Sequence, residues 1–121
     1  MNRLLFWLGA LAGSSLLVSG AVAQTVALPQ LNQACVAAMD RGDLTAANRD
    51  CRQAATLAEA PGSRAPLAAQ TQAMDNLGDL ALAQGQAAEA ETLYKKSVAL
   101  QERSGARDTP ELAQSYERLG N

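Results

Sequence analysis

The sequence predicts an all-α protein built from stacked antiparallel helical hairpins, and three observations support this prediction. The pair Leu77-Gly78 recurs 42 residues later as Leu119-Gly120. A second echo, at 43 residues, links Gly42, Ala47, Cys51 and Leu57 to Gly85, Ala90, Tyr94 and Leu100. Aromatic residues make up only 3% of the chain, so the core must be built from alanine and leucine, which suits closely packed helices. Such a period is typical of helical-repeat solenoids rather than closed globules.

The first 23 residues have the composition of a secretory signal peptide. Arg3 gives a positive start, residues 4–18 are mostly apolar, and residues 21–23 form a small-x-small cleavage site. We therefore expect a cleaved leader and a helical domain over residues 24–121, located in the periplasm or outside the cell. The alternative is an uncleaved N-terminal membrane anchor facing the periplasm, because residues 4–23 have roughly the length that spans a bilayer.

About five helices are expected after the signal peptide. Pro29, Pro66 and Pro110 can each open a helix, because the N–H that proline lacks has no partner in the first turn. Thr109 is a suitable N-cap for the last helix, and Gly105 a suitable C-cap for the one before it. The expected helices are 29–40 and 44–58 in a first hairpin, 66–84 and 87–104 in a second, and an orphan helix at 110–121.

Gly78 lies in the middle of an expected helix, where glycine costs roughly 1 kcal/mol relative to alanine. Its recurrence at Gly120 indicates that a neighbouring helix packs too closely for a side chain. With the turn centred near residue 84, Gly78 should face Ala90. In the first hairpin, centred on residue 41, Cys35 should face Ala47.

The two cysteines could form a disulfide, since exported proteins meet oxidising conditions. The same register places the Cα atoms of Cys35 and Cys51 about 7 Å apart, near the upper limit for a bridge. A structural disulfide and two buried thiols therefore both stay open. A bridge across this loop would contribute roughly 3 kcal/mol to stability.

The second hairpin resembles the tetratricopeptide repeat. Leu77-Gly78, Gly85, Ala90, Tyr94 and Ser97 fall at its large–glycine, turn, alanine, aromatic and small positions. The stretch from Leu77 to Gly120 is most similar to the longer variant, of roughly 42 residues, seen in kinesin light chains and many bacterial proteins. Three positions depart from the family pattern: Ala81 stands for a tyrosine, Cys35 for a glycine and Cys51 for an aromatic.

The resemblance implies a concave face, lined by the first helix of each hairpin, that holds an extended peptide or a partner helix. The implied groove residues are Gln72, Asp75, Asn76 and Asp79, with Asn32, Val36, Gln114 and Glu117 from the neighbouring hairpins. Acids stand where carboxylate-binding members carry lysine or arginine, so a basic or amide-rich partner segment is expected. Alternatively, Asp75 and Asp79 form only a solvated helix face.

Nothing in the sequence points to an enzyme. The chain has no histidine, which excludes a Ser-His-Asp triad and a His-ligated metal. It also lacks the glycine-rich nucleotide motifs and the calcium loop, and its lysines and arginines do not form the basic patch of a nucleic-acid-binding protein. We therefore expect an exported, non-catalytic scaffold that needs no cofactor and binds a protein or peptide.

Two other functions fit the same residues. The chain could be a structural protein that self-associates through its last helix, because array ends usually need a polar cap and this helix carries Leu112, Ala113, Tyr116 and Leu119. It could instead be an accessory subunit of a cell-envelope complex. Since the last expected helix reaches Asn121, the chain could also be part of a longer repeat protein.

Overall fold

The computed structural model describes residues 28–120, and all of its regular structure is helical. Residues 28–40 form a first helix, followed by α2 (Leu44–Glu59), α3 (Leu67–Ala83), α4 (Ala87–Arg103) and α5 (Pro110–Gly120). The all-α prediction is confirmed. The expected signal peptide or membrane anchor lies outside the described residues. Within residues 28–120, every helix is too short or too polar to cross a membrane.

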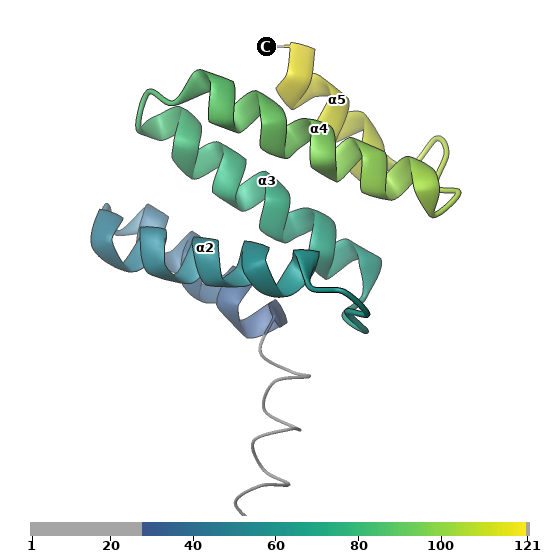
Figure 1. The fold of residues 1–121 in the computed structure, drawn as a ribbon. Coiled ribbons are helices and arrows are strands. Elements are labelled where there is room, and N and C mark those ends of the chain that lie inside the picture. The colour runs from purple at the N-terminus through teal and green to yellow at the C-terminus, as the bar shows by residue number, and fades with distance from the viewer. Residues whose placement is uncertain (1–27, 121) are drawn as a thin grey trace, which may run out of the picture.

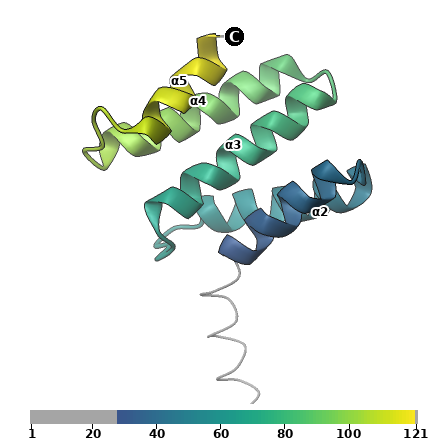
Figure 2. The same cartoon turned by 180° about the vertical axis from the view of Figure 1, so that it is seen from behind.

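The helices form antiparallel hairpins that stack side by side (Figure 1). The first helix pairs with α2, α3 pairs with α4, and α5 packs on α4. In Figure 1, α2 and α4 lie nearer to the viewer than the helices they pair with. In the reverse view of Figure 2, the first helix and α5 lie in front of α2 and α4, and α3 runs between the first helix and α5. The first helices of successive hairpins therefore share one side of the array, which we call the inner face.

The helix ends follow from local chemistry. The Asp43 carboxylate accepts a hydrogen bond from the backbone N–H of Ala46 (3.1 Å), and the Thr109 hydroxyl accepts one from that of Leu112 (3.2 Å). Both residues thus satisfy donors that a helix start leaves free. The ends of α2 to α5 lie within one residue of the expected positions. Pro66 is the N-cap of α3 and not its first residue.

Small residues build most of the core, as the low aromatic content requires. Four alanines, at positions 38, 47, 54 and 73, are fully buried. α3 packs on both α2 and α4 and therefore supplies the larger core side chains Met74, Leu77 and Leu80. The alanines let the helix axes approach closely, and the larger side chains of α3 fill the space that remains between the two hairpins.

The ring of Tyr94 lies beside Gly78 in the second hairpin. A Cβ atom built on Gly78 would lie 2.5 Å from Cε1 of Tyr94, so the ring occupies the space that the glycine leaves free. Ala90, one helical turn before Tyr94, is buried in a cluster with Ala81 and Tyr94. The close approach predicted at Gly78 is therefore filled by an aromatic side chain, and the facing of Gly78 and Ala90 stays a prediction.

The predicted register of the first hairpin is wrong. Cys35 lies level with Cys51 and not with Ala47: a disulfide joins the two cysteines, and their Cα atoms are 4.8 Å apart. The predicted separation of about 7 Å was too long, because it placed the turn two residues too early. The midpoint of the bridged pair is Asp43, the N-cap of α2.

Candidate partner-binding face

The implied groove residues all lie on helices of the inner face, but they differ in exposure. Gln72, Gln114 and Glu117 are exposed, whereas Asp75 and Asn76 are buried. Asp79 and Val36 are half-buried, and Asn32 is fully buried. The structure therefore divides the set into residues that can meet a partner and residues that hold the helices together.

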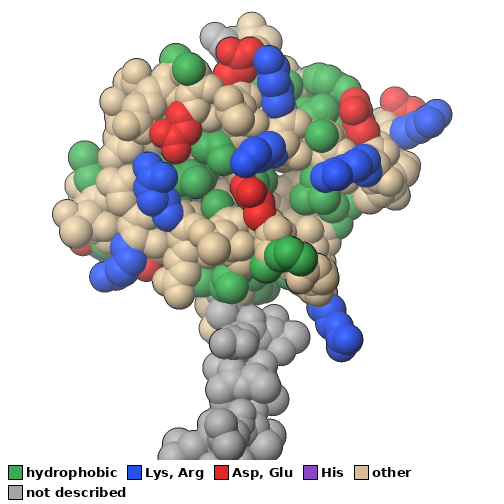
Figure 3. All heavy atoms as spheres, in the orientation of Figure 1, with side chains coloured by type: hydrophobic (Ala, Val, Ile, Leu, Met, Phe, Trp, Pro, Cys, Tyr) green, Lys and Arg blue, Asp and Glu red, His purple; other side chains and the backbone are tan. Residues whose placement is uncertain are grey.

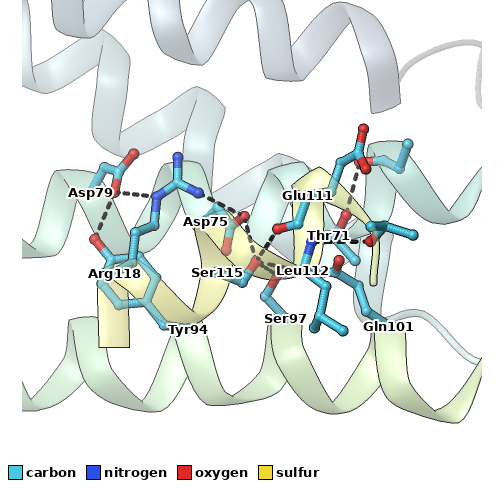
Figure 4. A network of polar contacts seen from close by, with 12 residues as sticks. Thr71, Asp75, Asp79, Tyr94, Ser97, Gln101, Glu111, Leu112, Ser115 and Arg118 are labelled. Atoms are coloured by element: carbon cyan, nitrogen blue, oxygen red, sulfur yellow. Dashed lines mark hydrogen bonds and ion pairs between the residues drawn. The ribbon is translucent and has the colours of Figure 1, made fainter. Parts of the chain in front are cut away.

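Asp75 and Asp79 are held by Arg118 of α5 (Figure 4). The Arg118 guanidinium lies 3.2 Å from Oδ2 of Asp75 through Nη1 and 3.3 Å from Oδ1 of Asp79 through Nε. One cation thus offsets part of the charge of two carboxylates. The surface is less acidic than Asp75 and Asp79 alone suggest.

Tyr94 joins the same network from α4. Its hydroxyl donates a hydrogen bond of 2.6 Å to Oδ1 of Asp79. Its ring covers Gly78, the residue before Asp79 in α3. Burial, followed by the nearby Asp79 carboxylate, raises the pKa of the Tyr94 phenol well above its usual value. The tyrosine therefore stays protonated and keeps donating to Asp79.

A buried hydroxyl connects α5 to both helices of the second hairpin. The Ser115 hydroxyl accepts a hydrogen bond from Nε2 of Gln101 (2.9 Å) and contacts Oγ of Ser97 (3.4 Å). It also lies 3.4 Å from Oδ2 of Asp75 and 3.1 Å from the carbonyl oxygen of Glu111. Figure 4 shows these groups converging between α3, α4 and α5.

The Asp75 carboxyl group is the titratable centre of this network. Its residue is only 9% exposed. Burial is the main reason that its pKa is raised, and the neighbouring Asp79 acts in the same direction, whereas Ser97, Arg118 and Ser115 oppose the rise. Asp75 thus fastens α5 to α3 and is not presented to a partner.

The preceding junction uses the equivalent position in the same way. Asn32 lies 43 residues before Asp75, and its Nδ2 donates a hydrogen bond of 2.9 Å to the carbonyl oxygen of Ala69 in α3. In both hairpins this polar residue of the first helix therefore links one repeat to the next. The sequence pattern did not predict this role of Asn32 and Asp75, nor the contacts of Arg118 and Ser115. A cation on the helix facing the Asp75/Asp79 pair was the signal that could have revealed Arg118.

The disulfide between Cys35 and Cys51 lies in the first hairpin at the positions that Gly78 and Tyr94 occupy in the second. Cys35 and Cys51 lie 43 residues before Gly78 and Tyr94, and both cysteines are fully buried. The bridge therefore lies inside the first hairpin, away from the inner-face surface.

A shallow hollow lies on the opposite side of the array, between α2 and α4. It measures about 490 Å³, has an apolar floor that includes Met74, Ala58 and Leu100, and carries Lys96 and Glu59 at its rim. These two charged groups form an ion pair of 3.2 Å and are about half exposed, so the pair contributes little stability. Figure 3 shows apolar and charged side chains mixed over this side.

The described residues contain no cluster of three side chains suited to a metal ion. These residues form an α-solenoid, in which helical hairpins repeat every 42 to 43 residues. The family model for the Tetratricopeptide repeat matches residues 70–121, and this part of the chain is a tetratricopeptide repeat of the longer variant. The predicted resemblance is confirmed. No curated protein and no solved structure gave a match.

Proposed function

We propose that this chain is a non-catalytic adaptor that binds an extended partner segment along its inner face. Tetratricopeptide repeats are protein–protein interaction modules, and the family is generally non-catalytic, which supports the proposal. The observation that carries the proposal is the pattern of exposure on that face. Gln72, Gln114 and Glu117 are exposed beside a network that fixes the helices carrying them.

The chemistry of these side chains favours a partner segment with amide or basic groups. Gln72 and Gln114 each offer a donor and an acceptor to a peptide backbone or to another amide. Glu117, together with the exposed part of Asp79, attracts lysine or arginine. Because the Arg118 and Ser115 contacts hold α5 in place beforehand, binding does not have to order the helix.

We also propose that the protein is exported. The apolar leader-like segment of residues 1–23 supports export, and a disulfide between Cys35 and Cys51 fits an oxidising compartment. The mass of the protein recovered from the cell envelope tests this proposal: a chain beginning at Gln24 is expected. A chain that keeps residues 1–23 would favour the membrane anchor instead.

Selection from a library of random extended peptides tests the partner chemistry. We expect enrichment of Lys, Arg, Asn and Gln over Asp and Glu, and loss of that enrichment in Gln72→Ala/Gln114→Ala. Gln53→Ala is the matched control, since Gln53 is exposed on α2, on the other side of the array. A double variant that selects the same peptides as the control would refute the inner-face site.

A charge reversal adds a second readout. Glu117→Lys is expected to shift the preference from basic toward acidic peptides, because it replaces an exposed acid on the inner face with a base. An unchanged preference would show that Glu117 does not contact the peptide.

A further inference from the structure

A groove runs along the opposite side of the array from the inner face. It lies between α2 and α4, the second helices of the two hairpins, and α3 packs on both of them and forms its floor (Figure 1). Two hollows of about 490 and 670 Å³ lie along it, the first over Met74 and the second over Leu77. We call these two hollows together the outer groove.

Two ion pairs cross the outer groove from one helix to the other. Arg52 of α2 lies 3.6 Å from Glu89 of α4, and Glu59 of α2 lies 3.2 Å from Lys96 of α4. Both pairs join residues 37 positions apart, so α2 and α4 run in the same direction. Glu59 and Lys96 line both hollows, and their ion pair therefore marks the boundary between them.

This boundary is easily opened. The side chains of Lys96 and Glu59 are 50% and 48% exposed, and an ion pair of this exposure contributes little stability. An incoming carboxylate can therefore take the place of Glu59 beside Lys96 at little cost in free energy. The two hollows can thus hold a single occupant.

The outer groove is basic, although the chain as a whole has a net charge of −2. Arg52, Lys96 and Arg103 stand at the rims of the hollows. Glu59 is the single acid among the described residues that line them. The complementary occupant therefore carries negative charge.

The shape of the outer groove favours an α-helix as the occupant. Met74 and Leu77 in the floor are only 2% and 7% exposed, so the hollows admit the ends of side chains and not a long acyl chain. The two floor residues are three positions apart in α3, about 4.5 Å along its axis. Apolar residues one turn apart on an amphipathic helix have a similar spacing and can enter one hollow each.

We propose that the outer groove binds an acidic amphipathic α-helix of a partner protein. Apolar residues one turn apart enter the two hollows, and carboxylates of the partner pair with Lys96 and Arg103. Binding displaces Glu59 from Lys96. The site lies on the other side of the array from the inner face and goes beyond the proposed function.

A designed peptide probes the outer groove directly. It has 17 residues, the length of α4, with leucine at positions i and i+4 on one face and glutamate and alanine elsewhere. Fluorescence anisotropy is expected to give saturable binding to the purified chain. A peptide with lysine in place of glutamate, and one with alanine in place of leucine, should each bind at least ~10-fold more weakly. Equal affinity of the three peptides would contradict the proposed chemistry.

Variants of the protein locate the binding. Lys96→Glu/Arg103→Glu is expected to weaken binding of the acidic peptide at least ~10-fold, because it reverses the charge of two rim residues. Lys95→Glu/Arg107→Glu is the matched control, since it changes the net charge equally at exposed positions that line neither hollow. Equal affinity of the two double variants would overturn the proposal.

A gain of affinity provides a readout that a folding defect cannot imitate. Glu59→Gln is expected to bind the acidic peptide about 2- to 5-fold more tightly, because Lys96 then has no competing carboxylate. Glu91→Gln is the matched control, since Glu91 pairs with Lys95 outside the outer groove. An affinity of Glu59→Gln no higher than that of Glu91→Gln would refute the displacement of Glu59.

Light scattering and sedimentation with vesicles distinguish other occupants. A concentration-dependent dimer, or binding to vesicles of anionic phosphatidylglycerol, overturns the proposal if Lys96→Glu/Arg103→Glu abolishes it, because a second copy or a membrane surface would then cover the groove. Gln72→Ala/Gln114→Ala is expected to bind the acidic peptide normally. Failure of the inner-face site would leave this result unchanged, so the two proposals can fail separately.

Discussion

The ring of Tyr94 lies over Gly78, at the position where the first hairpin has a disulfide instead of a packed ring. In both hairpins the two residues are 16 positions apart, and the pairs are related by a shift of 43 residues. One hairpin is closed by an aromatic side chain in a glycine notch and the other by a covalent bond. The two solutions lead to different predictions.

Gly78→Ala should destabilise the protein by about 1–3 kcal/mol, even though alanine is the better helix former. The new Cβ atom would lie 2.5 Å from the buried Tyr94 ring, which cannot move aside without breaking its bond to Asp79. Urea unfolding measures the change. Gly120→Ala is the matched control and should be neutral or slightly stabilising, because its surroundings are open.

Reduction of the disulfide should lower the unfolding free energy by about 3 kcal/mol, because the bridge closes a loop with a sequence separation of 16. The measurement is urea unfolding with and without reductant. Cys35→Ala/Cys51→Ala should match the reduced protein and no longer respond to reductant. A reductant effect that persists in this variant would show that the bridge is not its cause.

The second hairpin also suggests a way to replace the bridge. The triple variant Cys35→Gly/Val36→Asp/Cys51→Tyr supplies the glycine notch, the ring and the acceptor for its hydroxyl. We expect it to regain part of the stability that Cys35→Ala/Cys51→Ala loses, because a buried aromatic side chain contributes packing and a hydrogen bond. Hydrogen exchange of α2 amides reports the recovery. Protection no higher than in the double alanine variant would contradict the equivalence of the two positions.

Asp75 should make stability depend on pH. Its folded pKa is raised, chiefly by burial, so its contribution is fully present below the unfolded pKa of about 3.9 and is lost as the pH rises through the folded pKa. Asp75→Asn should remove this loss. Urea unfolding from about pH 4 to about pH 8, compared between the two proteins, isolates the effect.

Arg118 opposes that loss, because it is the cation beside Asp75. In Arg118→Gln the decline of stability with rising pH should be steeper, and the cost near neutral pH should be about 1–3 kcal/mol. A pH profile parallel to that of the parent would show that Arg118 does not act through the carboxylate.

The α5 junction should respond to its buried polar groups. Ser97, Gln101 and Ser115 stand where the preceding junction has Ala54, Ala58 and Ala73. Ser115→Ala alone removes the hydroxyl that Gln101 and Asp75 share. It should lower the free energy of opening α5 by about 1 kcal/mol. Replacing all three residues with alanine should cost less than the sum of the single changes, because no donor is then left unsatisfied. Hydrogen exchange of α5 amides measures both effects.

The sequence by itself determined the helices, their ends and the repeat. Prolines, glycines and caps such as Thr109 act within a few residues, so they predict helix bounds without knowledge of the fold. The recurrence of Leu77-Gly78 at Leu119-Gly120 predicted a helical repeat, and the positions of Gly85, Ala90, Tyr94 and Ser97 added the resemblance to the tetratricopeptide repeat, which the family model matches over residues 70–121. The localisation and the inner-face site stay predictions.

Only the tertiary structure decided which residues face each other. The centre of the first turn lies two residues later than predicted, which moves each pairing by four residues, about one helical turn along the axis, and brings Cys35 to Cys51. In the second hairpin the Tyr94 ring lies over Gly78. The tertiary structure also decided that Asp75, expected in an open groove, is buried and held by Arg118, which is 43 residues away in the sequence. Packing between helices sets such contacts, and local sequence patterns do not record it.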